Sequence, residues 1–248
     1  MKKNNFLFAS SVLFLLVYFG ACGLDAYYTL SPPVTVNHPV IYTANDPAEK
    51  YYGFTTARNS DLDSFRVLGT AVYYRIYASA SVMLSHTSSI SAVNTSSDYS
   101  AAANRMISYG YQQLYTSDGS VQPLLSVEGA RVNIRLTNNQ ETVADGIENM
   151  AQISIEPTGY YKTPRRSLGI NKTFDFGRYD ISRYSDKRDN YTPPASGDED
   201  FESGTVTDKK YYVNMYAVAV GRDTTYTTYY SNVLHLGSIV IDAGAENN

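Results

Sequence analysis

The most regular stretch of this 248-residue chain is Tyr211-Tyr212-Val213-Asn214-Met215-Tyr216-Ala217-Val218-Ala219-Val220. Its odd-numbered and even-numbered positions form two sets, and both sets are largely apolar or aromatic. Side chains of a strand alternate between its two faces, so both faces of this segment need cover. A turn at 221–223 leads to further apolar segments at 230–236 and 238–241. The pattern predicts paired strands in the middle of a β-sandwich.

A second long strand is predicted at residues 70–78. The two-residue period places one set of apolar side chains on a single face, namely Val72, Tyr74, Ile76 and Ala78. Residues 51–56 are also rich in aromatic and Thr residues and are expected to pair with this strand across the polar turn 58–63.

Tyrosine dominates the composition, with 24 Tyr beside 9 Phe and no Trp. Tyr, Thr and Val favour pleated, half-buried surfaces, so the chain is predicted to be mainly β. The formal net charge is −4. Nucleic-acid binding needs clustered Lys and Arg, and the charge balance therefore excludes it. The nearest basic cluster, Lys162 with Arg165-Arg166, is expected to be a solvated loop.

Residues 97–116 interrupt the β pattern. Apolar side chains recur there at spacings of three and four, with Asp98 near the start; they are Tyr99, Ala103, Met106, Ile107, Gly110 and Leu114. This spacing predicts one amphipathic helix that packs on the core. Strands are expected at 130–136 and 151–156, and the charged, proline-bearing residues 183–210 are expected to form a long mobile loop.

These strands resemble the fibronectin type III family of the immunoglobulin-like sandwiches. Residues 211–217 are similar to its F strand, Ser231-Asn232-Val233 to its G strand, and Leu68-Gly69 with residues 72–77 to its C strand. The core tryptophan of the family is missing, and Phe54 is a possible stand-in.

The resemblance implies one seven-stranded sandwich over residues 49–241, with residues 79–205 as a long insert that carries the helix. Two small β domains are the alternative. Residues 22–48, which contain several prolines, are expected to form a tether and a first edge strand at 36–42, and residues 242–248 a C-terminal tail.

The start of the chain has the pattern of a secretory signal peptide. Residues 1–5 are short and basic, and an apolar stretch at 6–19 is too short to span a bilayer as a helix. Gly20-Ala21 and the only cysteine of the chain, Cys22, follow at once. Residues 1–21 are therefore predicted to be a signal peptide.

The segment Phe19-Gly20-Ala21-Cys22 resembles the lipobox of bacterial lipoproteins, with Phe19 where Leu is usual. The resemblance implies cleavage before Cys22 and attachment of acyl chains such as palmitate at this residue, which would hold the protein on a membrane. Residues 22–33 look like the start of certain spirochaete lipoproteins. The expected location is the cell envelope, outside the cytoplasm, on the outer or inner membrane.

Catalytic and metal-binding signatures are missing from the sequence. His38, His86 and His235 lie far apart, without a second ligand at short spacing. The chain has no G-x-S-x-G elbow and no glycine-rich phosphate cradle, and Cys22 is assigned to the anchor. Asp198-Glu199-Asp200 lacks the spaced oxygen pattern of a calcium site. No catalytic residue, metal ligand or cofactor is predicted.

Three functions follow from these observations. The first is a non-catalytic binding or structural module, because tyrosine-rich faces suit protein recognition. The second is a glycan-binding module that uses tyrosine rings as platforms for sugars. The third is a hydrolase with its site in the insert 79–205, since a glycosidase needs only two suitably placed carboxylates among 24 acidic residues.

Overall fold

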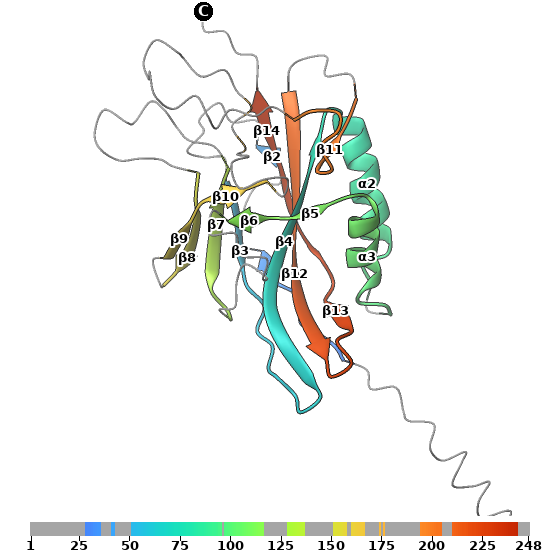
Figure 1. The fold of residues 1–248 in the computed structure, drawn as a ribbon, viewed down its shortest axis with the longest axis vertical. Helices are drawn as coiled ribbons and strands as arrows, with labels where there is room; N and C mark the ends of the chain where they lie inside the picture. The colour runs from blue at the N-terminus through green and yellow to red at the C-terminus, as the bar shows by residue number, and fades with distance from the viewer. Residues whose placement is uncertain are drawn as a thin grey trace, which may run out of the picture.

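The computed structural model describes residues 28–35, 41–42, 51–95, 97–116, 128–136, 151–157, 160–166, 174, 176, 194–204 and 210–242. These residues form three layers: two helices, a seven-stranded sheet and a five-stranded sheet (Figure 1). The helices are α2 (Ala80–Ala92) and α3 (Ala101–Ser108). The prediction of a mainly β chain is confirmed.

The seven-stranded sheet is built around β12 (Lys210–Asp223), which pairs antiparallel with β4 (Phe65–Tyr77) and β14 (Leu234–Asp242). The β4–β12 register runs from Tyr77 opposite Tyr212 to Phe65 opposite Asp223. Shorter strands complete the sheet at its edges: β2 (Ile41–Tyr42), β5 (Gln112–Gln113), β11 (Phe201–Glu202) and β13 (Thr228–Tyr230).

The five-stranded sheet has the order β1-β3-β7-β8-β9. Its members are β1 (Val34–Thr35), β3 (Tyr51–Thr55), β7 (Arg131–Arg135), β8 (Ile153–Glu156) and β9 (Tyr160–Lys162). A two-stranded sheet lies beside it and joins β6 (Tyr115–Thr116) to β10 (Pro164–Arg165).

The main core lies between the two larger sheets. The predicted face of β4 points into it, and Phe54 of β3 is fully buried there. The two-residue period brings the buried side chains of both sheets together: Val72, Tyr74, Ile76, Val213, Met215 and Ala217 from one, Val132, Ile134, Ile153 and Ile155 from the other.

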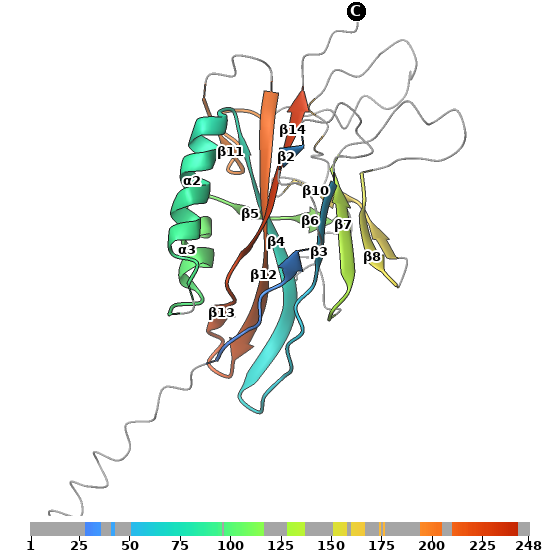
Figure 2. The same cartoon turned by 180° about the vertical axis from the view of Figure 1, so that it is seen from behind.

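The opposite face of β12 is covered by the helices (Figure 2). Tyr216, Val218 and Val220 pack there with apolar side chains of α2 and α3, namely Met83, Ile90, Ala102, Ala103 and Met106. The prediction of cover on both faces of this strand is thus confirmed, but a second sheet supplies it on one face only.

The predicted helix over 97–116 is present but shorter, and the insert at 79–205, expected to carry one helix, holds two in its described part. Helix α3 begins after Asp98, whose Oδ1 accepts a hydrogen bond from the N–H of Ala101 at 3.1 Å. It ends before Gly110, whose φ of +79° is typical of a glycine that closes a helix. Beyond it, Leu114 donates its N–H to the carbonyl of Val72 at 2.7 Å, so pairing with β4 overrides the helical spacing. Helix α2 was not predicted.

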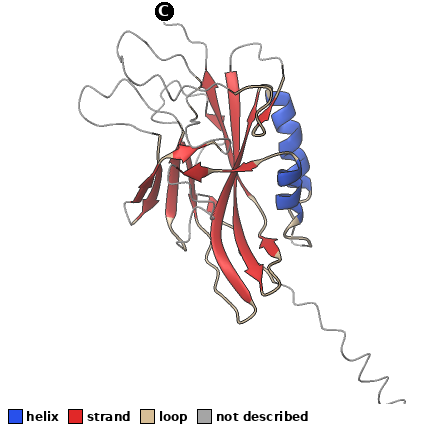
Figure 3. Ribbon diagram, in the orientation of Figure 1, coloured by secondary structure: helices blue, strands red, loops and turns tan. Residues whose placement is uncertain are grey.

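Strands make up most of the described secondary structure, and the helices lie to one side of them (Figure 3). The expected hairpin of residues 51–56 with 70–78 is wrong. Strand β3 pairs with β1 and β7, whereas β4 pairs with β12, β5 and β11. The two strands face each other across the core instead of sharing a ladder. Of the expected edge strand at 36–42, residues 36–40 lie outside the described residues, while β2 closes the large sheet.

Arg166 was expected in a solvated loop, yet it is only 1% exposed. Its Nε and one terminal nitrogen donate to the two carboxylate oxygens of Asp200, each at 2.8 Å. The same terminal nitrogen donates to Asp198 at 2.5 Å, and the hydroxyl of Tyr74 donates to Asp200 at 2.6 Å. Burial alone would lower the pKa of Arg166, but the hydrogen bonds and charges of Asp200 and Asp198 outweigh it and raise that pKa.

The expected long loop at 183–210 is corrected by the same cluster. Residues 183–193 and 205–209 lie outside the described residues, but Asp200 is fully buried and its carbonyl accepts the N–H of Ile76 at 2.9 Å. Strand β11 follows directly and adds to the sheet beside β4. The acidic residues therefore bind an arginine in the core.

We expect Arg166→Met to lower the free energy of unfolding by about 3–5 kcal/mol, because it leaves the Asp200 carboxylate buried without its cation. The double variant Arg166→Met with Asp200→Asn removes both charges and keeps an acceptor for Tyr74, so it should be more stable than the single variant. Urea unfolding measures both. Arg105→Met, on the exposed face of α3, is the control and should change stability by less than about 0.5 kcal/mol. A double variant less stable than Arg166→Met would contradict this account.

Candidate functional site

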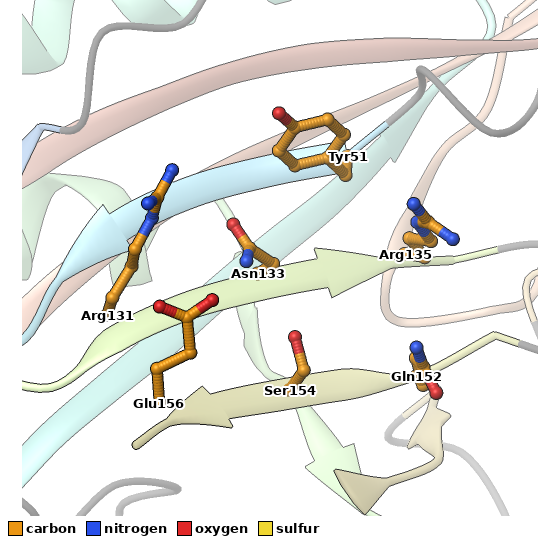
Figure 4. Close-up of a pocket in the computed structure, with 7 residues that line it drawn as sticks. All are labelled: Tyr51, Arg131, Asn133, Arg135, Gln152, Ser154 and Glu156. Carbon is orange, nitrogen blue, oxygen red and sulfur yellow. The ribbon is translucent and has the colours of Figure 1, made fainter. Parts of the chain in front are cut away.

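A polar hollow of about 280 Å³ lies on the outer face of the five-stranded sheet (Figure 4). We call it the polar strip. Strands β3, β7 and β8, with the residue directly before β8, supply its side chains: Tyr51, Arg131, Asn133, Arg135, Gln152, Ser154 and Glu156.

The strip follows from strict alternation on two neighbouring strands. In β7 the apolar Val132 and Ile134 point into the core, which leaves the intervening polar residues on the outer face. In β8 the same alternation holds, with Ile153 and Ile155 pointing inward. Opposite Asn133 on β3 stands Gly53, which has no side chain to fill the centre of the strip.

The two arginines of β7 lie near the two ends of the strip, about 13 Å apart along the strand by its rise per residue. Glu156 stands opposite Arg131 in the register, and Gln152 exchanges two backbone hydrogen bonds with Arg135, at 2.8 and 3.0 Å. Between them, the Oδ1 atom of Asn133 is buried and has no hydrogen-bond partner within the described part of the chain.

This set of groups is suited to binding rather than to bond cleavage. Guanidinium groups match carboxylates in a bidentate geometry, and amides and hydroxyls exchange hydrogen bonds with ligand hydroxyls. Glu156 is the only carboxylate among the described residues that line the strip. Within the described ranges, no three His, Cys, Asp or Glu residues come together as a metal site.

The sequence pattern did not predict the strip, although its signal was present. Both strands were predicted, and every second residue of each is polar, from Arg131 to Arg135 and from Gln152 to Glu156. What the pattern did not contain was the pairing of β7 with β8 and of β7 with β3, which brings these residues onto one surface.

The histidines occupy a different place, between the large sheet and α2. His235 of β14 donates from Nε2 to Oδ1 of Asn214 at 2.7 Å, since the amide nitrogen of Asn214 already donates to Tyr111 and Thr87, at 2.8 and 3.0 Å. His86 of α2 lies within hydrogen-bond distance of the Tyr77 hydroxyl, at 3.1 Å. His38 lies outside the described residues, so no third histidine is placed near these two.

Five tyrosines in the described part of the chain are buried in the interior. Tyr52, Tyr74, Tyr77, Tyr111 and Tyr216 are buried, and their hydroxyls or rings contact one another and the polar groups around them. In the described part of the chain, only Tyr226 is exposed, at 79%. The exposed tyrosine face expected for protein recognition is therefore not found among these residues.

Cys22, the predicted site of lipid attachment, lies outside the described residues. No helix in the described part of the chain is long and apolar enough to cross a bilayer. Comparison of the chain with known protein families, with curated proteins and with solved structures finds no match.

We expect stability to fall as the pH is lowered from about 6.5 to about 4. Burial lowers the pKa of His235 to about 4, so the unfolded chain binds a proton in this range that the folded chain does not. The loss attributable to this residue is about 3 kcal/mol. His235→Gln keeps a donor toward Asn214 and does not titrate, so its unfolding free energy should depend less on pH. Parallel curves for the two proteins would refute the assignment.

Proposed function

We propose that this protein is an exported lipoprotein, anchored by acyl chains on Cys22, whose polar strip is a non-catalytic binding site for a carbohydrate that carries a carboxylate. The observation that carries the ligand class is the composition of the strip, whose described side chains comprise two guanidinium groups, one carboxylate, two amides and two hydroxyls. A hydroxyl-rich anionic ligand complements each of these groups.

The anchor rests on the sequence. A basic start, an apolar stretch of 14 residues and Gly20-Ala21 before Cys22 together have the pattern of a lipoprotein signal peptide. Two or three acyl chains hold a protein stably on a membrane. The ligand-binding domain would thus be held in the cell envelope, outside the cytoplasm.

The fibronectin type III-like fold remains part of the proposal. The segments that resemble the family's C and F strands lie in β4 and β12, which pair with each other. Ser231–Val233, which resembles its G strand, directly precedes β14, and β14 pairs with the other side of β12. Phe54, the stand-in for the family's tryptophan, is buried in the core. Their adjacency supports the resemblance. Helices α2 and α3 would then belong to the insert at 79–205.

Ligand binding can be tested with residues 23–248 by titration calorimetry against a uronic-acid oligosaccharide and its neutral, carboxyl-reduced counterpart. We expect binding of the acidic form only, and a loss of at least about tenfold for the double variant Arg131→Ala with Arg135→Ala, because each charged hydrogen bond contributes about 1.5–3 kcal/mol. Arg105→Ala, an exposed arginine on α3, is the matched control and should bind as the parent does.

Equal affinity for the acidic and neutral sugars, or an unchanged affinity in the double variant, would contradict the role of the arginines. Thermal unfolding of the parent, the double variant and the control shows whether a loss of binding reflects a loss of fold. Because both strip arginines are at least partly exposed, little change in stability is expected.

The anchor is tested separately by the intact mass of the protein isolated from cells. The expected product begins at Cys22 and carries acyl mass, which Cys22→Ala should abolish together with partitioning into detergent. A chain that is cleaved at another position, or that carries no acyl mass, would remove the anchor from the proposal.

A further inference from the structure

One end of the molecule brings together two turns and the start of the described chain (Figure 1). Strands β4 and β12 are antiparallel, and Phe65 at the beginning of β4 lies opposite Asp223 at the end of β12. The turn before β4 and the turn between β12 and β13 therefore lie at the same end. We call this end the tip and define it by Leu62, Arg66, Arg222 and Tyr226.

The two turns expose large apolar side chains. Leu62 is 62% exposed and Tyr226 is 79% exposed, the two highest values for large hydrophobic residues in the described part of the chain. Leu62 exchanges backbone hydrogen bonds with Phe65 at 2.8 and 3.0 Å, and this small bridge fixes the turn. Each apolar side chain is thus held outward by a closed turn.

Tyr226 is presented by a turn built around Asp223. One oxygen of this carboxylate, Oδ1, accepts the N–H groups of Thr225 and Thr227, each at 2.9 Å, and the hydroxyl of Thr225 at 2.7 Å. These hydrogen bonds hold the pKa of Asp223 below its usual value, although partial burial opposes them. Tyr226 itself has a φ of +66°, a conformation that a bulky residue rarely adopts and that the turn must enforce.

Two arginines stand side by side next to these turns. Arg66 of β4 and Arg222 of β12 are direct partners in the register, and both are exposed. Like charges directly opposite each other destabilise a strand pair unless an anion lies between them. No ion pair is found for either within the described residues. Of the nearby carboxylates, Asp61 accepts the N–H of Val67 at 2.7 Å, Asp223 holds its turn, and Asp63 is exposed.

The chain leaves the folded domain at this same end. The ring of Tyr28 stacks on Phe65 with centroids 4.6 Å apart, and its hydroxyl donates to Oγ of Ser64 at 2.6 Å. Five residues lie between Cys22 and Tyr28, and the six steps from one to the other span at most about 20 Å. An acyl anchor on Cys22 would keep the tip within that distance of the membrane surface.

We propose that the tip is a membrane-contact surface: Leu62 and Tyr226 enter the interfacial layer of the bilayer that holds the anchor, and Arg66 with Arg222 binds a phospholipid phosphate. The proposal rests on the proposed lipid anchor for the approach of the tip to the bilayer. Tyrosine is well suited to this layer, because its ring is apolar and its hydroxyl remains hydrated. The polar strip lies on a different sheet and is then held in a defined orientation relative to the membrane.

The chain contains no Trp, so Tyr226→Trp places the single tryptophan fluorophore of the full-length protein at the tip. The matched control is Leu84→Trp, at a 55% exposed position on α2. Both proteins are reconstituted in vesicles of phosphatidylethanolamine and phosphatidylglycerol, with and without brominated acyl chains. For the tip probe we expect emission at shorter wavelength, quenching by the brominated lipid, and a reduction of about twofold in quenching by acrylamide. The control probe should behave as it does in solution.

A tip probe that stays as accessible to acrylamide as the control would overturn the proposal. An emission shift that appears without vesicles and grows with protein concentration would also overturn it, because it would indicate that a second copy of the chain binds the tip. Adding Arg66→Glu with Arg222→Glu should diminish the shift. The anchor and the tip are tested by separate experiments. If the intact mass shows no acylation, the thiol of Cys22 is coupled to a maleimide-bearing lipid, and the fluorescence measurement then tests the tip alone.

Discussion

The structure depends on the burial of β12 on both of its faces. A strand that carries apolar and aromatic side chains at odd and even positions cannot remain at a surface, so it recruits one layer on each side. The five-stranded sheet covers one face and the pair of helices covers the other. Both layers pack against the central strands β4, β12 and β14.

Polar residues in the interior form hydrogen bonds that connect the central strands to other segments. The Arg166–Asp200 pair links the segment after β10 to β4 through the hydroxyl of Tyr74, while the amide of Asn214 joins β12 to Thr87 of α2. Buried polar groups of this kind add little net stability by themselves. Each must nevertheless be hydrogen-bonded, so a fold that separates it from its partners is disfavoured. Two buried tyrosines act in the same way, because Tyr52 and Tyr74 fill volume in the core and donate their hydroxyls to Val213 and Asp200.

Because both faces of the central sheet are covered, the two surfaces proposed for ligands lie on the outer sheet and at the ends of the strands. The polar strip uses the first place, with side chains that alternate outward from β7 and β8. The tip uses the second, where the longest strands end in turns. The two surfaces differ in chemistry: the strip is polar throughout, whereas the tip combines exposed apolar side chains with a pair of like charges.

Local periodicity was sufficient to predict the strands at 70–78, 130–136, 151–156 and 211–220, because alternation is a property of each strand alone. The signal segment and Cys22 are likewise read from neighbouring residues, and they remain predictions. Strand pairing was not determined locally. Residues 112–114 pair with β4 although their spacing is helical, and β3 pairs with β7 instead of β4. Arg166 binds an aspartate 34 residues away in the sequence. The polar strip depends on that same pairing. Such contacts join distant segments, and only the folded chain decides them, since their energies depend on burial and on partners that no single segment contains.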